Sequence, residues 1–384
     1  MQFRSNNSTF EYYTLVTGIH EESDQVFVTL ERSEFYVEGG GQPSDLGSIQ
    51  SLAIRSMHEI SGEIWHELED RGDLFQGMRV KVIIDKEHRL EMSRQHTGQH
   101  LLSAFLHRDH DVRTVGFHIG TETATIDTDV PVTEEILEDV TENVLQAIRE
   151  GIPVTAFIES GEDLKRLGLR KDTDLPGDVQ IIRIGDLDFS ACCGTHVDST
   201  RELLFFIVRK VEKHKEGSRI YFQFGQRALM FAMDSVRIVQ NIKEQLEVHE
   251  TELPFRVGML KEQTQDDHRV IAELREKLAR AMLADPAWQG GLIYQELEEE
   301  EELIRTLSRG LAERGQDSIL LDLRERKVYG NIFKDGLHGG RLFKELKNSS
   351  IRGGGGPRAF QGVADSAEEL IAFGRRLKAA LEEQ

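Results

Sequence analysis

The 384-residue chain is poor in cysteine and contains only two. They are adjacent, as Cys192 and Cys193, and neighbouring cysteines rarely bond to each other. A disulfide framework is therefore excluded, and we expect the reducing cytoplasm to be the compartment.

Long apolar runs are also absent. The longest, from Leu203 to Val208, is far too short to span a bilayer. The opening stretch MQFRSNNSTFEYY lacks the apolar segment of a secretory signal. We therefore expect no membrane partner and no export.

Positive charge is scarce, because 47 Lys and Arg stand against 68 Asp and Glu, for a net charge of −21. This balance argues against a protein that coats nucleic acid through a generally positive surface. A local exception lies between residues 341 and 358. This segment contains five basic residues and one acidic residue, Glu345. The basic residues are Arg341, Lys344, Lys347, Arg352 and Arg358.

The composition, 39% hydrophobic and 30% charged, is typical of a globular protein, and the length predicts two or three domains. The first 85 residues are β-rich, with alternating runs such as MRVKVIID between glycine-rich turns. Helices are predicted after Asp85 and from Thr133 to Glu150, where Thr133 can cap the start and Gly151 ends the helix. Strands are expected in IPVTAFIE and in VQIIRIGDLDFS, which leads directly into Cys192.

We predict an α+β fold with four parts. Residues 1–88 form a glycine-rich, β-barrel-like domain, and residues 89–234 form a mixed α/β domain. Residues 235–286 form a helical arm that is broken at Pro254, and residues 287–384 form a small C-terminal α/β domain. The second half of the arm carries an apolar stripe of Ile271, Leu274, Leu278 and Met282 at spacings of three and four residues, as in a short coiled-coil seam.

Two short motifs suggest a metal site. In HTGQH, His96 and His100 are one helical turn apart and can reach one ion, although this spacing alone is unspecific and usually means two solvated side chains. In SACCGTH, Cys192 and His196 repeat the four-residue step after a strand. Three imidazoles and one thiolate form a set that zinc favours. Cys193 can replace Cys192, and the spacing leaves open whether the zinc is structural or catalytic.

These motifs resemble a known family. HTGQH and CCGTH resemble the HxxxH and CxxxH signature of the editing domain of alanyl-tRNA synthetase, which is also seen in threonyl-tRNA synthetase. EFYVEGGGQPSDLGSI resembles the glycine-rich segment of the alanyl branch, and SIRGGGGPRAFQGVAD resembles its C-terminal, DHH-associated domain. Because the aminoacylation half is missing, the chain is similar to the free-standing AlaX editing proteins in their long form. Two departures are Cys193, where the family usually has glycine, and the smaller number of glycines in the last motif.

The resemblance implies one zinc ion per chain, held by His96, His100, Cys192 and His196. It implies hydrolysis of the ester that joins a wrong amino acid to tRNA(Ala), with serine the main error and glycine a second one. The partner is then mischarged tRNA(Ala). ATP binding is implied by the resemblance alone.

Further residues are candidates for the substrate site. Thr114, and after it Thr125, can sense the hydroxyl of serine, although each can equally be an ordinary strand residue. Gly39, Gly40 and Gly41 allow close approach of the terminal adenosine or the ester, or form an ordinary turn, and Gln42 can donate to the same group. Arg352 and Arg358, in the basic glycine-rich segment, are candidates for RNA contact.

Three other interpretations are compatible with the sequence. The chain can be a zinc-stabilised RNA-binding module without catalysis, which predicts a closed zinc site without a pocket. It can be an unrelated zinc esterase, which leaves the arm and the basic segment without a role. Finally, the arm or the C-terminal domain can form a homodimer, which is compatible with editing.

Overall fold

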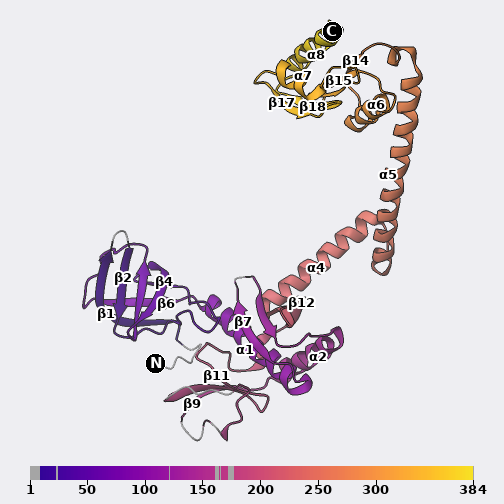
Figure 1. The fold of residues 1–384 in the computed structure, drawn as a ribbon. Coiled ribbons are helices and arrows are strands. Elements are labelled where there is room, and N and C mark those ends of the chain that lie inside the picture. The colour runs from indigo at the N-terminus through magenta and orange to yellow at the C-terminus, as the bar shows by residue number, and fades with distance from the viewer. Residues whose placement is uncertain are drawn as a thin grey trace. The chain divides into compact units, whose positions relative to one another are not determined.

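The computed structural model describes residues 9–383 except 23–24, 121, 161–163, 165 and 172–176, and Figure 1 shows its elements. The chain forms two compact units, Met1–Ile242 and Lys243–Gln384. The fold is α+β, as predicted. Over the described residues, every helix is too short or too polar to cross a bilayer.

The first unit begins with a closed six-stranded barrel, which confirms the barrel expected at the N-terminus. Its strand order is β1-β2-β5-β4-β3-β6. Alternate residues in the first half of β1 are buried, and two of them, Tyr12 and Val16, share a core with Val28, Leu68 and Val80. Closure removes the unpaired strand edges of an open sheet. The strands are β1 (Glu11–Glu22), β2 (Gln25–Leu30), β3 (Gly47–Ile49), β4 (Leu52–Ile60), β5 (Glu63–Leu68) and β6 (Arg79–Ile84).

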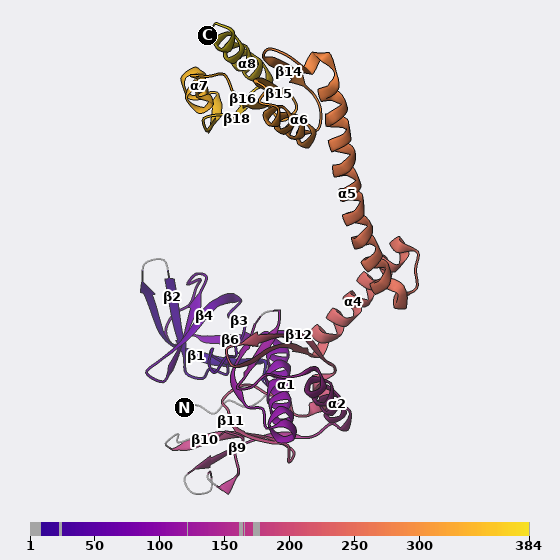
Figure 2. The same ribbon diagram turned by 45° about the vertical axis from the view of Figure 1, so that its right-hand side comes forward.

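The remainder of this unit surrounds a buried helix, α1 (Lys86–His110). Asp85 caps its start by accepting a hydrogen bond from the backbone N–H of His88. Thr133 and Gly151 begin and end α2 (Glu134–Glu150), as predicted. Figure 2 shows α1 and α2 side by side. Their apolar residues share one core with the sheet side chains Ile126, Ile182 and Phe222, among others.

Two sheets complete the unit. The four-stranded sheet has the order β12-β13-β8-β7 and the three-stranded sheet the order β11-β10-β9. The segment VQIIRIGDLDFS was expected to form a strand. It instead forms a hairpin of β10 and β11, because a turn at Gly185 divides it. The strands are β7 (Thr114–Ile119), β8 (Ala124–Thr128), β9 (Val154–Ser160), β10 (Asp178–Ile184), β11 (Asp188–Ala191), β12 (Phe206–His214) and β13 (Gly217–Phe224), and a 3-10 turn, η1 (Thr200–Leu203), precedes β12.

The long helices differ from the expected arm. Helix α4 (Gly225–Leu246) begins ten residues earlier than predicted and runs across the boundary between the units. The break lies at residues 247–252, which include the 3-10 turn η2 (Glu250–Glu252). Pro254 does not break a helix but lies in the first turn of α5 (Leu253–Ala284), where its missing N–H has no helical partner to lose.

The second unit has a five-stranded sheet in the order β14-β15-β16-β18-β17. Strands β14 and β15 are parallel and the other pairs are antiparallel. Ile319, Phe343 and Phe373 are central to its core. Its elements after α5 are η3 (Pro286–Trp288), β14 (Ile293–Leu297), α6 (Glu301–Glu313), β15 (Ser318–Asp322), β16 (Lys327–Asn331), α7 (Gly339–Leu346), β17 (Ile351–Gly355), β18 (Ala359–Ala364) and α8 (Ala367–Glu382).

Candidate metal centre and its cleft

The four side chains expected to share a metal ion lie together in the first unit. The middle of α1 provides His96 and His100, and the loop that follows β11 provides Cys192 and His196. One potential ligand atom of each side chain lies within 4.8 Å of the others. The structure thus brings together residues that are almost a hundred positions apart in the chain.

The spacing of these atoms fits an ion of the size and preference of zinc. The Cys192 sulfur lies 3.4 Å from Nε2 of His96 and 3.4 Å from Nε2 of His196. Zinc–sulfur and zinc–nitrogen bonds of about 2.3 and 2.1 Å at a tetrahedral angle separate the two donor atoms by about 3.6 Å. The donors therefore already have nearly the separation that a bound ion requires.

Each histidine is held through its Nδ1 atom. His96 contacts Oε1 of Gln42 at 2.7 Å, His100 contacts Oδ2 of Asp188 at 2.9 Å, and His196 contacts Oγ1 of Thr97 at 3.0 Å. In all three, Nε2 is left for a metal. Such partners fix the tautomer and the orientation of a metal-binding histidine.

The loop that carries the cysteine requires a glycine at position 194. A Cβ atom built there would lie 2.2 Å from Cε1 of the His96 ring and 2.8 Å from Oε1 of Gln42. The next residue, Thr195, accepts hydrogen bonds at its hydroxyl from Gln42 and from Ser93, both at 2.8 Å. The loop is thereby fixed against both α1 and the glycine-rich segment.

Burial and mutual attraction perturb the protonation of the cluster. Burial lowers the pKa of His100, but hydrogen bonds with Asp188 and Cys192 outweigh it and raise the pKa to about 9. Burial lowers the pKa of His196 to about 4. Burial alone would raise the pKa of Cys192, yet the nearby histidines bring it well below its ordinary value. A thiol in this environment is readily available as a thiolate, the form that binds metal.

Cys193 has a different environment from Cys192. The residue is exposed to solvent overall. Partial removal of its thiol from water nevertheless raises the pKa of that thiol. It is not among the clustered donor atoms. The geometry therefore selects Cys192, an alternative that spacing alone left open.

The metal cluster opens on a cleft of about 1340 Å³. The glycine-rich segment between β2 and β3, barrel strand β4, strand β7 and the cysteine loop provide its walls. The residues around it include 36–41, 44–46, 54–59, His96, Gln99, His100, 114–117, Arg170, Lys171 and 190–194. A closed structural zinc site would not have such an adjoining space.

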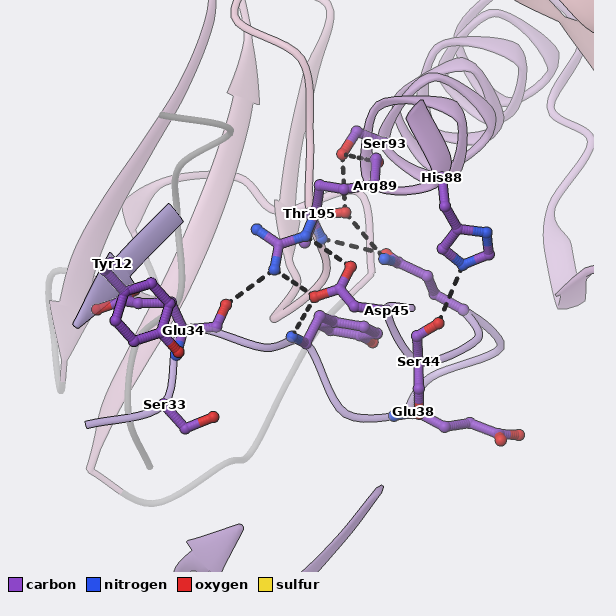
Figure 3. A network of polar contacts seen from close by, with 12 residues as sticks. Tyr12, Ser33, Glu34, Glu38, Ser44, Asp45, His88, Arg89, Ser93 and Thr195 are labelled. Carbon is purple, nitrogen blue, oxygen red and sulfur yellow. Dashed lines mark hydrogen bonds and ion pairs between the residues drawn. The ribbon is translucent and has the colours of Figure 1, made fainter. Parts of the chain in front are cut away.

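The glycine-rich segment is anchored next to this cleft. Figure 3 shows the buried ion pair of Arg89, from α1, with Asp45, and the contact of His88 with the backbone carbonyl of Ser44 at 3.0 Å. Gly41 has a φ of +85°, and a Cβ atom there would lie 2.8 Å from the carbonyl oxygen of Phe117. Only glycine suits this position, because the backbone is left-handed and closely approaches β7.

The other predicted site residues have varied positions. Gly39, Gly40, Gly41 and Thr114 line the cleft, and Thr114 contacts the hydroxyl of Ser103 at 2.7 Å. Thr125 lies in β8, paired with His118 and Tyr221, and is not among the residues that line the cleft.

Gln42 is buried, and its side chain contacts protein groups at both ends. Nε2 donates to Thr195, and Oε1 contacts His96 and accepts a hydrogen bond from the backbone N–H of Thr195 at 3.1 Å. Its position supports an indirect role rather than donation to a reacting ester.

Arg352 and Arg358 lie in the second unit. The Arg352 side chain is 77% exposed and contacts Asp365 at 3.4 Å. The Arg358 guanidinium lies 5.5 Å from the centre of the Phe333 ring.

Sequence reasoning did not single out Thr97, Asp188 or Arg170. Thr97 lies inside the HTGQH motif, so its proximity to a ligand could have been inferred. Asp188 and Arg170 come from positions without a motif, and only the β10–β11 hairpin and the residues before it bring them to His100.

Comparisons with known proteins agree with the motifs. Residues 179–221 match the family described as threonyl and alanyl tRNA synthetase second additional domain. This range contains Cys192 and His196 but not the histidines of α1.

Three curated proteins illustrate the similarity. The chain is 37% identical over 224 residues to "Alanyl-tRNA editing protein AlaX-L" of Pyrococcus horikoshii, which covers 56% of this chain and 55% of that protein. It is 27% identical over 303 residues to an "Alanine--tRNA ligase" of Methanopyrus kandleri, covering 75% of this chain and 33% of that protein. It is 27% identical over 305 residues to "Alanyl-tRNA editing protein Aarsd1" of Mus musculus, covering 77% of this chain and 73% of that protein.

The chain therefore resembles alanyl-tRNA editing proteins, as its motifs suggested. The matched region spans about half the length of the first relative and a third of the second.

Proposed function

We propose that this chain is a trans-editing deacylase that hydrolyses the ester of mischarged tRNA(Ala), with serine as the main amino acid removed and glycine as a second. The observation that carries the proposal is a four-donor metal cluster that opens directly on a large cleft. The similarity to proteins named alanyl-tRNA editing proteins supports the same substrate class. Because charged tRNA is made and used there, we place the activity in the cytoplasm.

The proposed metal is one zinc ion per chain, held by His96, His100, Cys192 and His196. Three nitrogens and one thiolate are typical zinc ligands, and their spacing supports this choice. When bound, zinc can polarise an ester carbonyl or lower the pKa of a water molecule. The chain's own residues then bind the RNA end, orient the ester and discriminate between amino acids.

The size of the cleft supports a macromolecular substrate. Small-molecule sites commonly have volumes of about 300–1,000 Å³, and this cleft, of about 1340 Å³, exceeds that range. We propose that Gly39, Gly40 and Gly41 form the wall against which the terminal adenosine lies. Because these residues have no side chains, the adenosine can approach the backbone closely.

We assign Thr114 to recognition of the serine hydroxyl. Thr114 lines the cleft, and its hydroxyl contacts that of the buried Ser103 at 2.7 Å. We propose that the Thr114 hydroxyl also forms a hydrogen bond with the hydroxyl of a seryl ester. An alanyl ester would leave the Thr114 hydroxyl without that additional partner, and unmatched polar groups disfavour binding. Thr125, which lies away from the cleft, is not included in this role.

Gln42 is proposed as a positioning residue rather than a donor to the ester. Its amide holds the Nδ1 atom of His96 and the hydroxyl of Thr195, and it thereby links the glycine-rich segment to two parts of the metal cluster.

The second unit is proposed to contact RNA and to support a homodimer. Arg352 and Arg358 belong to the basic segment and can contact phosphates. On α5, Ile271, Leu274 and Leu278 are each about half exposed, while Met282 packs against the core of this unit. Three apolar side chains of one stripe thus remain available to a second copy.

A zinc-stabilised RNA-binding module without catalysis is the main alternative. It predicts a closed site, and the adjoining cleft favours the deacylase. An unrelated zinc esterase is the second alternative, and it predicts activity towards small esters that does not depend on RNA.

The decisive assay measures release of amino acid from Ser-tRNA(Ala), Gly-tRNA(Ala) and Ala-tRNA(Ala), with and without a chelator. We expect the protein to release serine from Ser-tRNA(Ala) and to leave Ala-tRNA(Ala) intact, and we expect the chelator to inhibit the release.

Cys192→Ala should lose zinc and activity, whereas Cys193→Ala should keep both. A thermal melt of each variant controls for unfolding, since metal binding and folding are coupled. A zinc-free, folded Cys192→Ala protein with full activity would refute the mechanism.

A further inference from the structure

We propose that Asp188 and Arg170 are positioning residues that hold His100 in the metal cluster from the wall of the cleft. This inference rests on the proposed function only in taking the cluster to be a metal site. Neither residue belongs to the motifs that indicated the site.

Asp188 is placed to fix the orientation of His100. Its side chain is fully buried, and its Oδ2 atom accepts a hydrogen bond from Nδ1 of His100 at 2.9 Å. When a metal ion binds, the imidazole keeps its proton on Nδ1, and the lone pair of Nε2 is available to the ion. A carboxylate in this position also makes the imidazole a stronger ligand.

Arg170 and Ser190 hold the carboxylate in turn. Nε of Arg170 lies 2.7 Å from Oδ1 of Asp188. The hydroxyl of Ser190 lies 3.0 and 2.9 Å from the two carboxylate oxygens and 3.1 Å from Nη2 of Arg170. The backbone N–H of Arg170 donates to the carbonyl of Phe189 at 2.9 Å, which fixes residue 170 beside β11.

Together with His100, the charge of Arg170 compensates the burial of this carboxylate. A buried carboxylate without a partner is costly, and removing one member of a buried pair leaves the other charge uncompensated. The partners of the other two histidines, Gln42 and Thr97, are neutral and need no counter-charge. Among the Nδ1 contacts described for the three histidines, that of His100 is with an ionised group, and this group is paired with Arg170.

Arg170 also lines the cleft. Its side chain is 17% exposed, so one chain of contacts leads from the cleft surface through Asp188 to a metal ligand. A change at Arg170 should therefore alter the metal site without touching any of its four ligands.

The test measures the affinity of the purified protein for Zn²⁺ by competition with a chromophoric chelator, in the absence of RNA. Asp188→Asn should weaken the affinity about 10- to 100-fold, as is usual when such a partner is removed. Arg170→Gln should also weaken it, and Arg170→Lys should restore part of the affinity, because lysine keeps the charge but not the fork of donors. The matched control is Arg219→Gln, which breaks another Arg–Asp pair of the same unit, the pair of Arg219 with Asp127 on β8. The Zn²⁺ affinity of this variant should equal that of the unchanged protein.

A spectrum of the Co²⁺-substituted protein provides a second measurement. In Asp188→Asn, the ligand-field bands should change while the thiolate charge-transfer band persists, since Cys192 is intact. A purely structural role would leave the spectrum of the folded variant unchanged.

Wild-type Zn²⁺ affinity and an unchanged Co²⁺ spectrum in folded Asp188→Asn would overturn the proposal. If Asp188→Asn does not fold, Arg170→Gln and Ser190→Ala decide, because both leave Asp188 and His100 in place. Normal affinity in both would equally overturn it. A protein that binds Zn²⁺ in this way but releases no amino acid from tRNA would contradict only the proposed function.

Discussion

At the scale of single residues, the candidate metal cluster is held in place by groups outside its four donor side chains. Its three imidazoles are oriented by an amide, a carboxylate and a hydroxyl, which come from the glycine-rich segment, from β11 and from α1 itself. The four clustered side chains were predictable from the two four-residue spacings taken together and from the resemblance of their motifs to a known family. Their partners were not, because a lone Gln, Asp or Thr has no distinguishing pattern in the sequence.

Gly194 gives the sharpest test at this scale. In Gly194→Ala, the new Cβ atom would meet the His96 ring at 2.2 Å, so the loop or the ring must move. Overpacking of this kind destabilises by about 1–3 kcal/mol, and zinc content should fall with it. Metal analysis and a thermal melt check both effects.

The control is Gly258→Ala in α5, where nothing lies within 4 Å of the added Cβ atom. It should be neutral or slightly stabilising, since alanine is favoured over glycine in a helix. Full zinc content in Gly194→Ala would show that the close approach at this loop is unimportant.

At the scale of elements, prediction from sequence succeeded where local signals were complete. Asp85, Thr133 and Gly151 cap helices as expected, because capping depends on a few adjacent residues. It failed at VQIIRIGDLDFS, where apolar residues continue to alternate with polar ones on both sides of Gly185, so that the turn does not interrupt the strand-like pattern. It also misplaced the break between the long helices, because Pro254 is as compatible with the first turn of a helix as with its end.

The exposed stripe of α5 gives a prediction about assembly. Leu274 is 57% exposed and lies between Ile271 and Leu278, so a second copy can bury all three. The full chain should be a dimer by analytical ultracentrifugation, and Leu274→Glu should reduce it to a monomer, since an apolar seam does not accommodate a buried, unpaired charge.

Gln265→Glu adds the same charge to an exposed position of α5 outside the stripe. It should remain a dimer. Equal dissociation of both variants would indicate general charge repulsion, and no effect of Leu274→Glu would place any interface elsewhere.

An ion-pair network at the start of α6 gives a prediction about acid stability. Hydrogen bonds from Lys327 and then from Tyr329 lower the pKa of Glu301 to about 2, from an ordinary value of 4.5. A lowered pKa means that the ionised group stabilises the folded unit above about pH 4.5, and that this contribution is lost as the pH falls towards 2.

Glu301→Gln should therefore destabilise the second unit at pH 7, on the order of 1 kcal/mol because the network is partly exposed. The difference in free energy of unfolding between this variant and the unchanged protein should become smaller as the pH falls from 4.5 to 2. Urea unfolding followed by the fluorescence of Trp288, in a Trp65→Phe background, measures this unit. Glu302→Gln, at an exposed neighbouring position, is the control. Its free energy of unfolding should differ much less from that of the unchanged protein at every pH.

At the scale of the whole molecule, the proposed function requires an acidic chain to bind an acidic polymer. The proposed solution is local, with Arg352 and Arg358 as phosphate contacts in the second unit. The double variant Arg352→Gln, Arg358→Gln should bind tRNA more weakly, and the slope of log affinity against log salt should fall by about one for each phosphate that is no longer neutralised.

Arg280→Gln removes an exposed charge of α5 and serves as the control for net charge. Zinc content should be unchanged in both proteins. An unaltered salt slope in the double variant would mean that these arginines do not contact RNA and that the second unit serves assembly instead.

The bridge between Gln42 and Thr195 has a consequence for how the protein folds. The two residues are 153 positions apart, and loops of this length close slowly, because the chain must give up its conformational entropy before the bridge forms. The orientation of His96 awaits this bridge, whereas α1 and the β10–β11 hairpin can form from nearby residues alone. In refolding, secondary structure should therefore appear first and tight zinc uptake last, so that the rate of metal acquisition reports the docking of the glycine-rich segment.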